Sequence, residues 1–97
     1  MPMRAHADVP TLNARRYMTQ LCKHWGHKFP VEFSEEDGRI ELTAGTCVMH
    51  AGAEALSIDV EAADEPAVRR LGDVVANHVA RFAFREELHF DWKPEAE

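Results

Sequence analysis

The sequence lacks a long apolar segment and has few cysteines, and both features limit what the chain can be. No run approaches the roughly 18 apolar residues of a membrane helix, so no membrane partner is expected. Residues 1–8 lack the apolar core of a secretory signal, which predicts a cytoplasmic protein. In that compartment the two cysteines in 97 residues are expected to be reduced thiols rather than a disulfide.

The patterns of common catalytic and metal-binding sites are also missing. The sequence has no CxxC, HExxH or EF-hand pattern, no GxSxG nucleophile turn and no glycine loop that would cradle a phosphate. Its acidic residues are scattered, so no pair can be assigned as acid and base. The sequence therefore predicts a non-enzymatic protein without catalytic residues, cofactor or metal.

The charge is negative overall but unevenly distributed. The net charge of −6 argues against nucleic acid as a partner. Residues 1–30 nevertheless carry five basic residues against one acid, and residues 31–97 carry six basic against sixteen acidic residues. The basic part is either a solvated helix face or a site for an anionic ligand or an acidic partner.

Residues 14–25 have the periodicity of an amphipathic helix. Thr11 is the predicted N-cap, and Gly26 is the predicted left-handed cap at the other end. Apolar residues recur every three or four positions, which gives the helix one buried stripe. This stripe consists of Ala14, Tyr17, Met18, Leu21, Cys22 and Trp25.

The rest of the chain predicts a sheet and a second helix. Residues 3–9 are expected to form a short first strand, and residues 30–34, 39–43, 46–51 and 55–62 an antiparallel meander. Asp37-Gly38 is the strongest turn signal of the meander. The second helix begins at Asp64, which is the predicted N-cap, and extends to Phe82. Residues 88–92 alternate as an extended segment, and residues 93–97 are expected to form a mobile polar tail.

These elements predict a single α+β domain over residues 1–97. Its order is strand, helix, four strands and helix, and its antiparallel sheet carries both helices on one face.

Two segments, residues 21–29 and 78–86, hold the densest groups of chemically capable side chains. We expect a ligand to bind where the two helices end, with lysines and histidines as donors and the two arginines holding an anion. The candidate ligand-binding residues are Lys23, His24, His27, Lys28, His78, Arg81, Arg85 and Glu86.

The histidines and cysteines allow other interpretations, but geometry limits them. Cys22 and His24 are about 200° apart on a helix, so they cannot hold one ion, and Cys22 is expected in the core. Cys47 and His50 point to opposite faces of a strand. His78 is either a core histidine with satisfied N–H groups or a partner of His24 across the helix interface.

The same segments resemble a known family. They look like the bacterial family called domain of unknown function 2218, through Tyr17, residues 21–28, 45–47, 56–58 and 78–86, and Trp92. This resemblance implies a small stand-alone bacterial domain with a TATA-binding-protein-like fold and no assigned activity. It also implies a link to iron metabolism, since relatives can occur beside or fused to siderophore-interacting flavin reductases. The fold alone does not imply DNA binding.

We therefore expect a cytoplasmic binding or accessory module, monomeric or homodimeric. Its partner would be an anionic small ligand, such as a ferric siderophore, or a protein of the siderophore-reductase type. One alternative is a metal-dependent redox or sensor protein that uses His24, His27 and His78. Another is a subunit of a complex that associates through its sheet face. Phe84 lies off the helical stripe and would be exposed or would cover a cleft.

Overall fold

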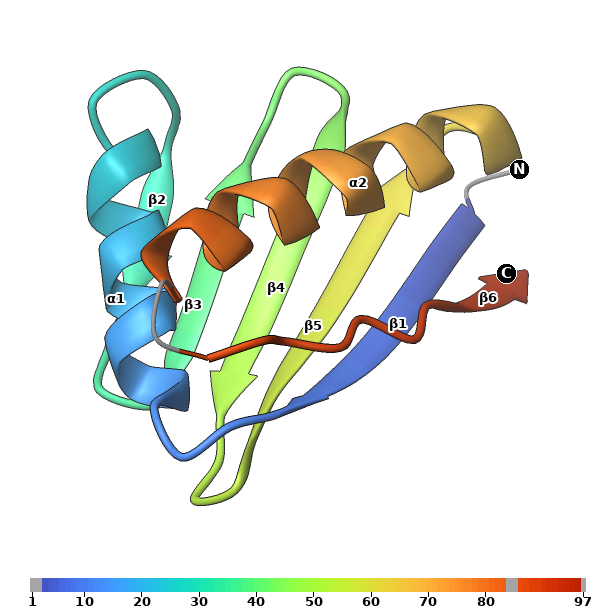
Figure 1. Cartoon of the computed structure of the whole chain (residues 1–97). Helices are drawn as coiled ribbons and strands as arrows, with labels where there is room; N and C mark the ends of the chain where they lie inside the picture. The colour runs from blue at the N-terminus through green and yellow to red at the C-terminus, as the bar shows by residue number, and fades with distance from the viewer. Residues whose placement is uncertain (1–2, 84–85, 97) are drawn as a thin grey trace.

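The computed structural model of the chain, which describes residues 3–83 and 86–96, has two layers (Figure 1). One layer is a six-stranded antiparallel sheet, and the other is a pair of helices on one face of it. The elements are β1 (Met3–Pro10), α1 (Ala14–Trp25), β2 (Val31–Phe33), β3 (Asp37–Glu41), β4 (Gly45–Ala51), β5 (Ala55–Ala62), α2 (Glu65–Phe82) and β6 (Lys93–Ala96). The predicted two-layer α+β fold is confirmed, and the TATA-binding-protein-like label, which fits these layers, stays a prediction.

Helix α1 buries the stripe that its sequence predicts. All six residues of the stripe are buried against the sheet, while Arg15, Arg16 and Lys23 on the other face are exposed. Each large side chain on this stripe contributes about 1.5–3 kcal/mol of burial free energy, before the entropy of ordering is subtracted. The apolar stripe therefore fixes which face of α1 meets the sheet.

Gly26 is the C-cap residue of α1, as predicted, but its left-handed conformation and the predicted N-cap are wrong. The helix begins at Ala14, so Asn13 is the N-cap residue and Thr11 lies before it. The Thr11 hydroxyl accepts from the backbone N–H of Asn13 at 3.0 Å, which organises the approach to the helix instead of capping it. Gly26 has φ −60° and ψ −17°, a right-handed conformation, because the chain continues in a turn whose N–H groups bond to the Trp25 carbonyl.

The sheet combines the predicted meander with the two ends of the chain. Its strand order is β2-β3-β4-β5-β1-β6, and all neighbours are antiparallel. Short turns join each strand to the next from β2 to β5, so these four strands lie side by side in chain order. Strand β1 pairs with β5 over its whole length, from Met3 opposite Ala62 to Pro10 opposite Ala55. The first strand is therefore inside the sheet, not at its edge.

The first hairpin turns earlier than the sequence predicts. Asp37 and Gly38 belong to β3, and the turn is closed by the Ser34 N–H, which donates to the Asp37 carbonyl at 2.8 Å. Gly38 is buried, and a Cβ built on it would lie 2.9 Å from the Cys22 sulfur. The glycine at this position thus allows α1 to pack closely on β3. Gly38, which we interpreted as a turn residue in the sequence, therefore serves helix packing.

Helix α2 begins as predicted. The Asp64 carboxylate accepts from the Ala67 N–H at 2.9 Å, and Pro66 occupies the first turn. The helix buries Val68, Leu71 and Val75 against the sheet. Within residues 3–83 and 86–96, no helix is both long enough and apolar enough to cross a membrane.

The C-terminal segment crosses the helix side of the sheet before it joins the sheet (Figure 1). Leu88, Phe90 and Trp92 pack against the core, which agrees with the alternating pattern predicted for residues 88–92. Residues 93–96 then pair with β1 as β6. The prediction of a mobile tail is wrong for these four residues, because their backbone groups bond to the edge of β1 that would otherwise be unpaired.

Candidate functional site

The two helices bring the predicted histidines together. The ring of His24, in the last turn of α1, has its centroid 5.5 Å from the ring of His78 and 6.1 Å from that of Phe82, both on α2. The Trp25 ring lies 4.8 Å from His78. We use the name helix-end surface for the predicted site residues in or near the ends of the two helices, which are Lys23, His24, His27, Lys28, His78 and Arg81.

His78 is held in one orientation by a backbone carbonyl. Its Nδ1 lies 2.7 Å from the carbonyl oxygen of Val74, one turn earlier in α2, so Nδ1–H donates to that oxygen. In the neutral ring the proton is then on Nδ1, and Nε2 keeps its lone pair. The His78 side chain is half-buried beside Trp25. Its Nδ1 is satisfied by the Val74 carbonyl, and its Nε2 is available to a partner.

The cations of the helix-end surface have no carboxylate partner within the part of the chain that the structure describes. Lys23, Lys28 and Arg81 are exposed and form no ion pair with any described residue. His27 is also exposed, just after the end of α1. Arg85, predicted as a second anion-binding arginine, and Phe84 lie outside the described residues.

Glu86 lies at a different place from the helix ends. Its carboxylate Oε2 accepts from the Thr11 hydroxyl at 3.2 Å, from the Asn13 side-chain amide at 2.9 Å and from the Tyr17 hydroxyl. Tyr17 is two turns before His24, a rise of about 10 Å along α1. Glu86 thus fastens the segment after α2 to the beginning of α1, and the structure does not bring it together with the histidines.

The Tyr17–Glu86 contact changes the acidity of both groups. The hydrogen bond from Tyr17, with those from Asn13 and Thr11, lowers the pKa of Glu86 below its ordinary value of 4.5. Burial, together with the neighbouring carboxylate, raises the pKa of Tyr17 above 10.0. The carboxylate is therefore the form of Glu86 that this network stabilises.

The cysteines are core residues. Cys22 and Cys47 are fully buried and free, as expected for Cys22, and Cys47 and His50 lie on opposite faces of β4. Burial raises the pKa of the Cys22 thiol to about 11 and that of Cys47 to about 12. Both thiols are thus protonated near neutral pH, which makes them weak nucleophiles and poor metal ligands.

No group of three or more histidine, cysteine, aspartate or glutamate side chains with the geometry of a metal site occurs among residues 3–83 and 86–96. His24 and His78 form a pair, and His27 makes no ring contact with either of them among the described residues. A metal bound at the helix ends would therefore take two ligands from this pair and the others from outside the described residues.

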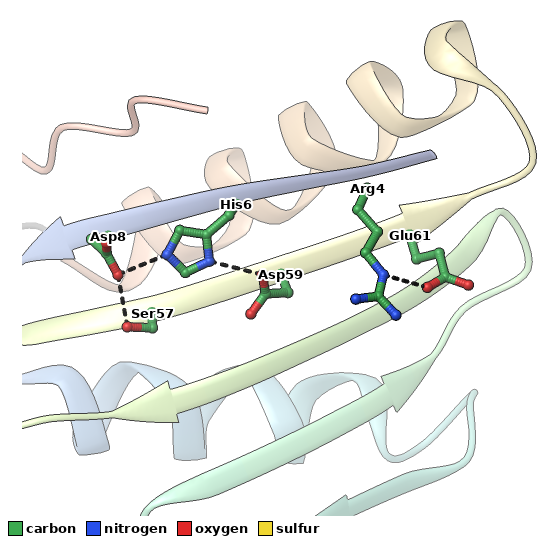
Figure 2. A network of polar contacts seen from close by, with 6 residues as sticks. All are labelled: Arg4, His6, Asp8, Ser57, Asp59 and Glu61. Carbon is green, nitrogen blue, oxygen red and sulfur yellow. Dashed lines mark hydrogen bonds and ion pairs between the residues drawn. The ribbon is translucent and has the colours of Figure 1, made fainter. Parts of the chain in front are cut away.

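The face of the sheet opposite the helices carries a second polar cluster (Figure 2). His6 on β1 lies between two carboxylates, with Nδ1 2.8 Å from Asp59 and Nε2 2.9 Å from Asp8. The Ser57 hydroxyl donates to Asp8 at 2.8 Å, and Arg4 donates to Glu61 at 2.9 Å. These contacts join β1 to β5, whose residues alternate between the core and this open face.

The cluster favours a charged His6. Its hydrogen bond to Asp59 raises the pKa of His6 above 6.5, burial opposes this rise, and Asp8 adds to it. The hydrogen bonds from Ser57 and His6 lower the pKa of Asp8. Although serine, histidine and aspartate are all present, Ser57 contacts Asp8 and not the imidazole, and a carboxylate of lowered pKa is a poor general base.

A depression lies on the open face, over β1, β3, β4 and β5. Its volume is about 220 Å³, and it is lined by Arg4, Arg39, Thr46, Val48, Asp59, Val60 and Glu61. Val48 is 39% exposed here, one of few large apolar side chains in the described chain that face solvent. The register places Arg39 and Asp59 on either side of Val48.

The sequence did not single out this open-face cluster. Its residues alternate with core residues along β1 and β5, which predicts only that they face solvent. The contact between them depends on the pairing of β1 with β5, with Arg4 opposite Glu61 and His6 opposite Asp59. Complementary charges at matching positions of the two strands are the one sequence signal that could have suggested this pairing.

Two comparisons with known proteins, one with a solved structure and one with a family model, give matches over most of the chain. The NMR structure of PA4090 from Pseudomonas aeruginosa has 35% sequence identity to this chain and a TM-score of 0.74, and the match covers 95% of this chain and 94% of that one. No functionally curated protein matches the chain. Residues 6–93 match the sequence model of a protein family, DUF2218, whose description is "uncharacterized protein conserved in bacteria". The chain therefore belongs to this bacterial family, DUF2218, as the blocks of residues 21–28 and 78–86 predict.

Proposed function

We propose that this domain is a non-enzymatic module that binds an anionic ligand at the helix-end surface. One observation carries the proposal: Lys23 and Arg81 lie in the last turns of two helices that touch through His24 and His78, Lys28 follows α1, and none of the three cations is paired with a described carboxylate. Elsewhere Arg4 and Arg69 do pair with acids of the chain.

The helix dipoles reduce this positive charge but do not cancel it. Each helix C-terminus carries a partial charge of about −0.5, so the two ends together offset about one of the three positive charges. A net charge of about +2 remains when the histidines are neutral. On a chain whose formal net charge is −6, this surface is a local exception that favours an anion or an acidic protein segment.

The finer proposal concerns iron. Ferric siderophores with net negative charge belong to the ligand class that this surface favours, and so does an acidic region of a siderophore-reductase-type protein. The resemblance to the family supports this link, and the charge of the helix-end surface is compatible with it.

Calorimetric titration with metal-free citrate and with a panel of anionic ferric siderophores tests the proposal. The native chain should show saturable binding that weakens with added salt. The double variant Lys23→Gln/Lys28→Gln should bind roughly tenfold more weakly, which corresponds to about 1.4 kcal/mol. The matched control Arg69→Gln/Arg70→Gln removes the same charge from exposed positions early in α2. The proposal fails if no ligand saturates or if the control weakens binding equally.

A second candidate function is that of a subunit which pairs with a second copy of itself through the open sheet face. Exposed Val48 favours it, because Arg39 and Asp59 flank it in one row of the sheet. With a twofold axis along β4, Arg39 of one copy would face Asp59 of the other. Light scattering tests this: Val48→Asp should convert a dimer to a monomer, while Thr43→Asp in an exposed turn should not. A monomeric native chain would exclude this function.

A further inference from the structure

We propose that His24 and His78 form a two-histidine site for a divalent transition metal, which the domain binds as an anionic metal chelate. This inference deepens the proposed function and rests on it, since it names the class of anion that the helix-end surface would take. The protein supplies two imidazole nitrogens, and the chelator supplies oxygen ligands and the negative charge.

The separation of the two rings matches shared coordination. In proteins the metal–nitrogen distance to histidine is about 2.0–2.1 Å. Two imidazoles on one ion at a tetrahedral angle therefore have ring centroids roughly 5 Å apart. The centroids of His24 and His78 are 5.5 Å apart. Since His24 is exposed, its side chain can turn its ring toward the ion without disturbing the core.

The hydrogen bond of His78 fits a metal ligand. Histidines that bind metals usually donate their second ring N–H to a carbonyl or carboxylate, which fixes the tautomer and directs the other nitrogen to the ion. The Nδ1 of His78 makes such a bond to the Val74 carbonyl at 2.7 Å. The nitrogen that remains, Nε2, is the one that a metal would take.

The surroundings explain why the metal would arrive with an anion. Lys23, Lys28 and Arg81 repel a bare divalent cation, yet the same side chains attract the carboxylates of a chelator. Two imidazoles also leave two to four coordination positions for other ligands. Imidazole nitrogens suit nickel, copper and zinc, so the expected ligand is a carboxylate chelate of one of these metals.

The test is calorimetry on the tag-free native chain with three probes: nickel ion, metal-free citrate and nickel–citrate. Nickel–citrate should bind at one equivalent and more tightly than either component alone. His24→Ala and His78→Ala should each weaken its binding by tenfold or more, since even removal of an outer partner of a ligand costs about 10–100-fold. The double variant should be no weaker than either single variant, because one lost ligand already breaks the site.

The control is His50→Ala. His50 is exposed on the opposite face of the sheet, where it pairs with Asp37. Its removal should leave nickel–citrate binding unchanged. Because His78 packs beside Trp25, a thermal melt should accompany His78→Ala, and the exposed His24→Ala variant decides the test if His78→Ala does not fold.

The three probes separate the inference from the proposed function. If metal-free citrate binds as tightly as nickel–citrate and His24→Ala has no effect, the two-histidine site is wrong and anion binding stands. If nickel ion binds through both histidines but citrate neither binds nor adds to its affinity, the domain does not take the metal as an anionic chelate and the inference is wrong, while the siderophore panel still decides the proposed function. If no probe saturates the native chain, the two-histidine site is overturned, and the proposed function is overturned with it when the ferric siderophore panel also fails to bind.

Discussion

The indole ring of Trp92 lies directly against the backbone of Gly72. A Cβ built on this glycine would be 3.2 Å from the nearest ring atom of Trp92, so the absence of a side chain lets the C-terminal segment pack on α2. This contact positions the chain just before β6, which then pairs with β1. One small residue in α2 therefore helps to place the last strand of the sheet.

We predict that Gly72→Leu displaces Trp92 and destabilises the domain. Overpacking at such a contact costs about 1–3 kcal/mol. Gly72→Ala is the control and should be close to neutral, because a gain in helix propensity of about 1 kcal/mol offsets the tight contact. Urea unfolding gives the free energies, and the indole N–H signal of Trp92 in a heteronuclear NMR spectrum should shift only in Gly72→Leu. An unmoved signal in a Gly72→Leu protein of native stability would contradict this account.

A second prediction concerns the contact between Gly38 and Cys22. Because an added Cβ would lie 2.9 Å from the sulfur, Gly38→Ala should cost about 1–3 kcal/mol of unfolding free energy. Cys22→Ala alone should also destabilise, since it leaves a cavity in the core. The double variant should recover part of the first loss, with a coupling free energy of at least about 0.5 kcal/mol. Strict additivity in the double-mutant cycle would show that the two residues do not share this space.

The third prediction follows from the lowered pKa of Glu86. A lowered pKa stabilises the fold above the unfolded value of 4.5, and this contribution disappears as the pH falls through the folded pKa. Glu86→Gln should therefore be less stable than the native chain at about pH 7, and the gap should close toward about pH 3. Urea unfolding across this range measures it. Glu87→Gln, at the exposed neighbouring position, is the matched control and should keep the native profile.

The raised pKa of His6 gives a fourth prediction with the opposite sign. Its stabilising contribution is complete below the unfolded value of 6.5 and is lost as the pH rises through the folded pKa. His6→Gln should therefore lose more stability at about pH 5.5 than at about pH 8.5. The comparison variant His50→Gln removes a histidine from the same face of the sheet. If His6→Gln loses as much at the higher pH, the ion pairs with Asp59 and Asp8 contribute nothing to stability.

The elements that periodicity defines were predictable, and the contacts that depend on tertiary pairing were not. Helix α1 and strand β5 match their predicted residues 14–25 and 55–62, because alternation and apolar stripes reflect burial directly. Asp37-Gly38 misled the prediction, since its glycine serves the packing of α1 and not a turn. Residues 93–96 looked like a tail because a polar edge strand has no apolar pattern to reveal it.

In the candidate site, too, the chain positions of the residues were predictable and their tertiary contacts were not. Chain position alone put the basic residues near the ends of the helices, and the structure adds the 5.5 Å contact between His24 and His78. Glu86 looked like part of that group because it follows α2 closely in the chain. Its engagement by Thr11, Asn13 and Tyr17 depends on the path of the chain after the helix, which no local pattern encodes.

The central place of β1 affects how this protein can fold as it is synthesised. Strand β1 is synthesised before its partners: it pairs with β5, whose residues follow 45 to 59 positions later, and its other edge pairs with β6. The meander from β2 to β5 can form early from local contacts and can take up β1, but the other edge of β1 stays unpaired until β6 has emerged. We therefore expect a chain released before β6 has emerged to expose the edge of β1, which favours aggregation.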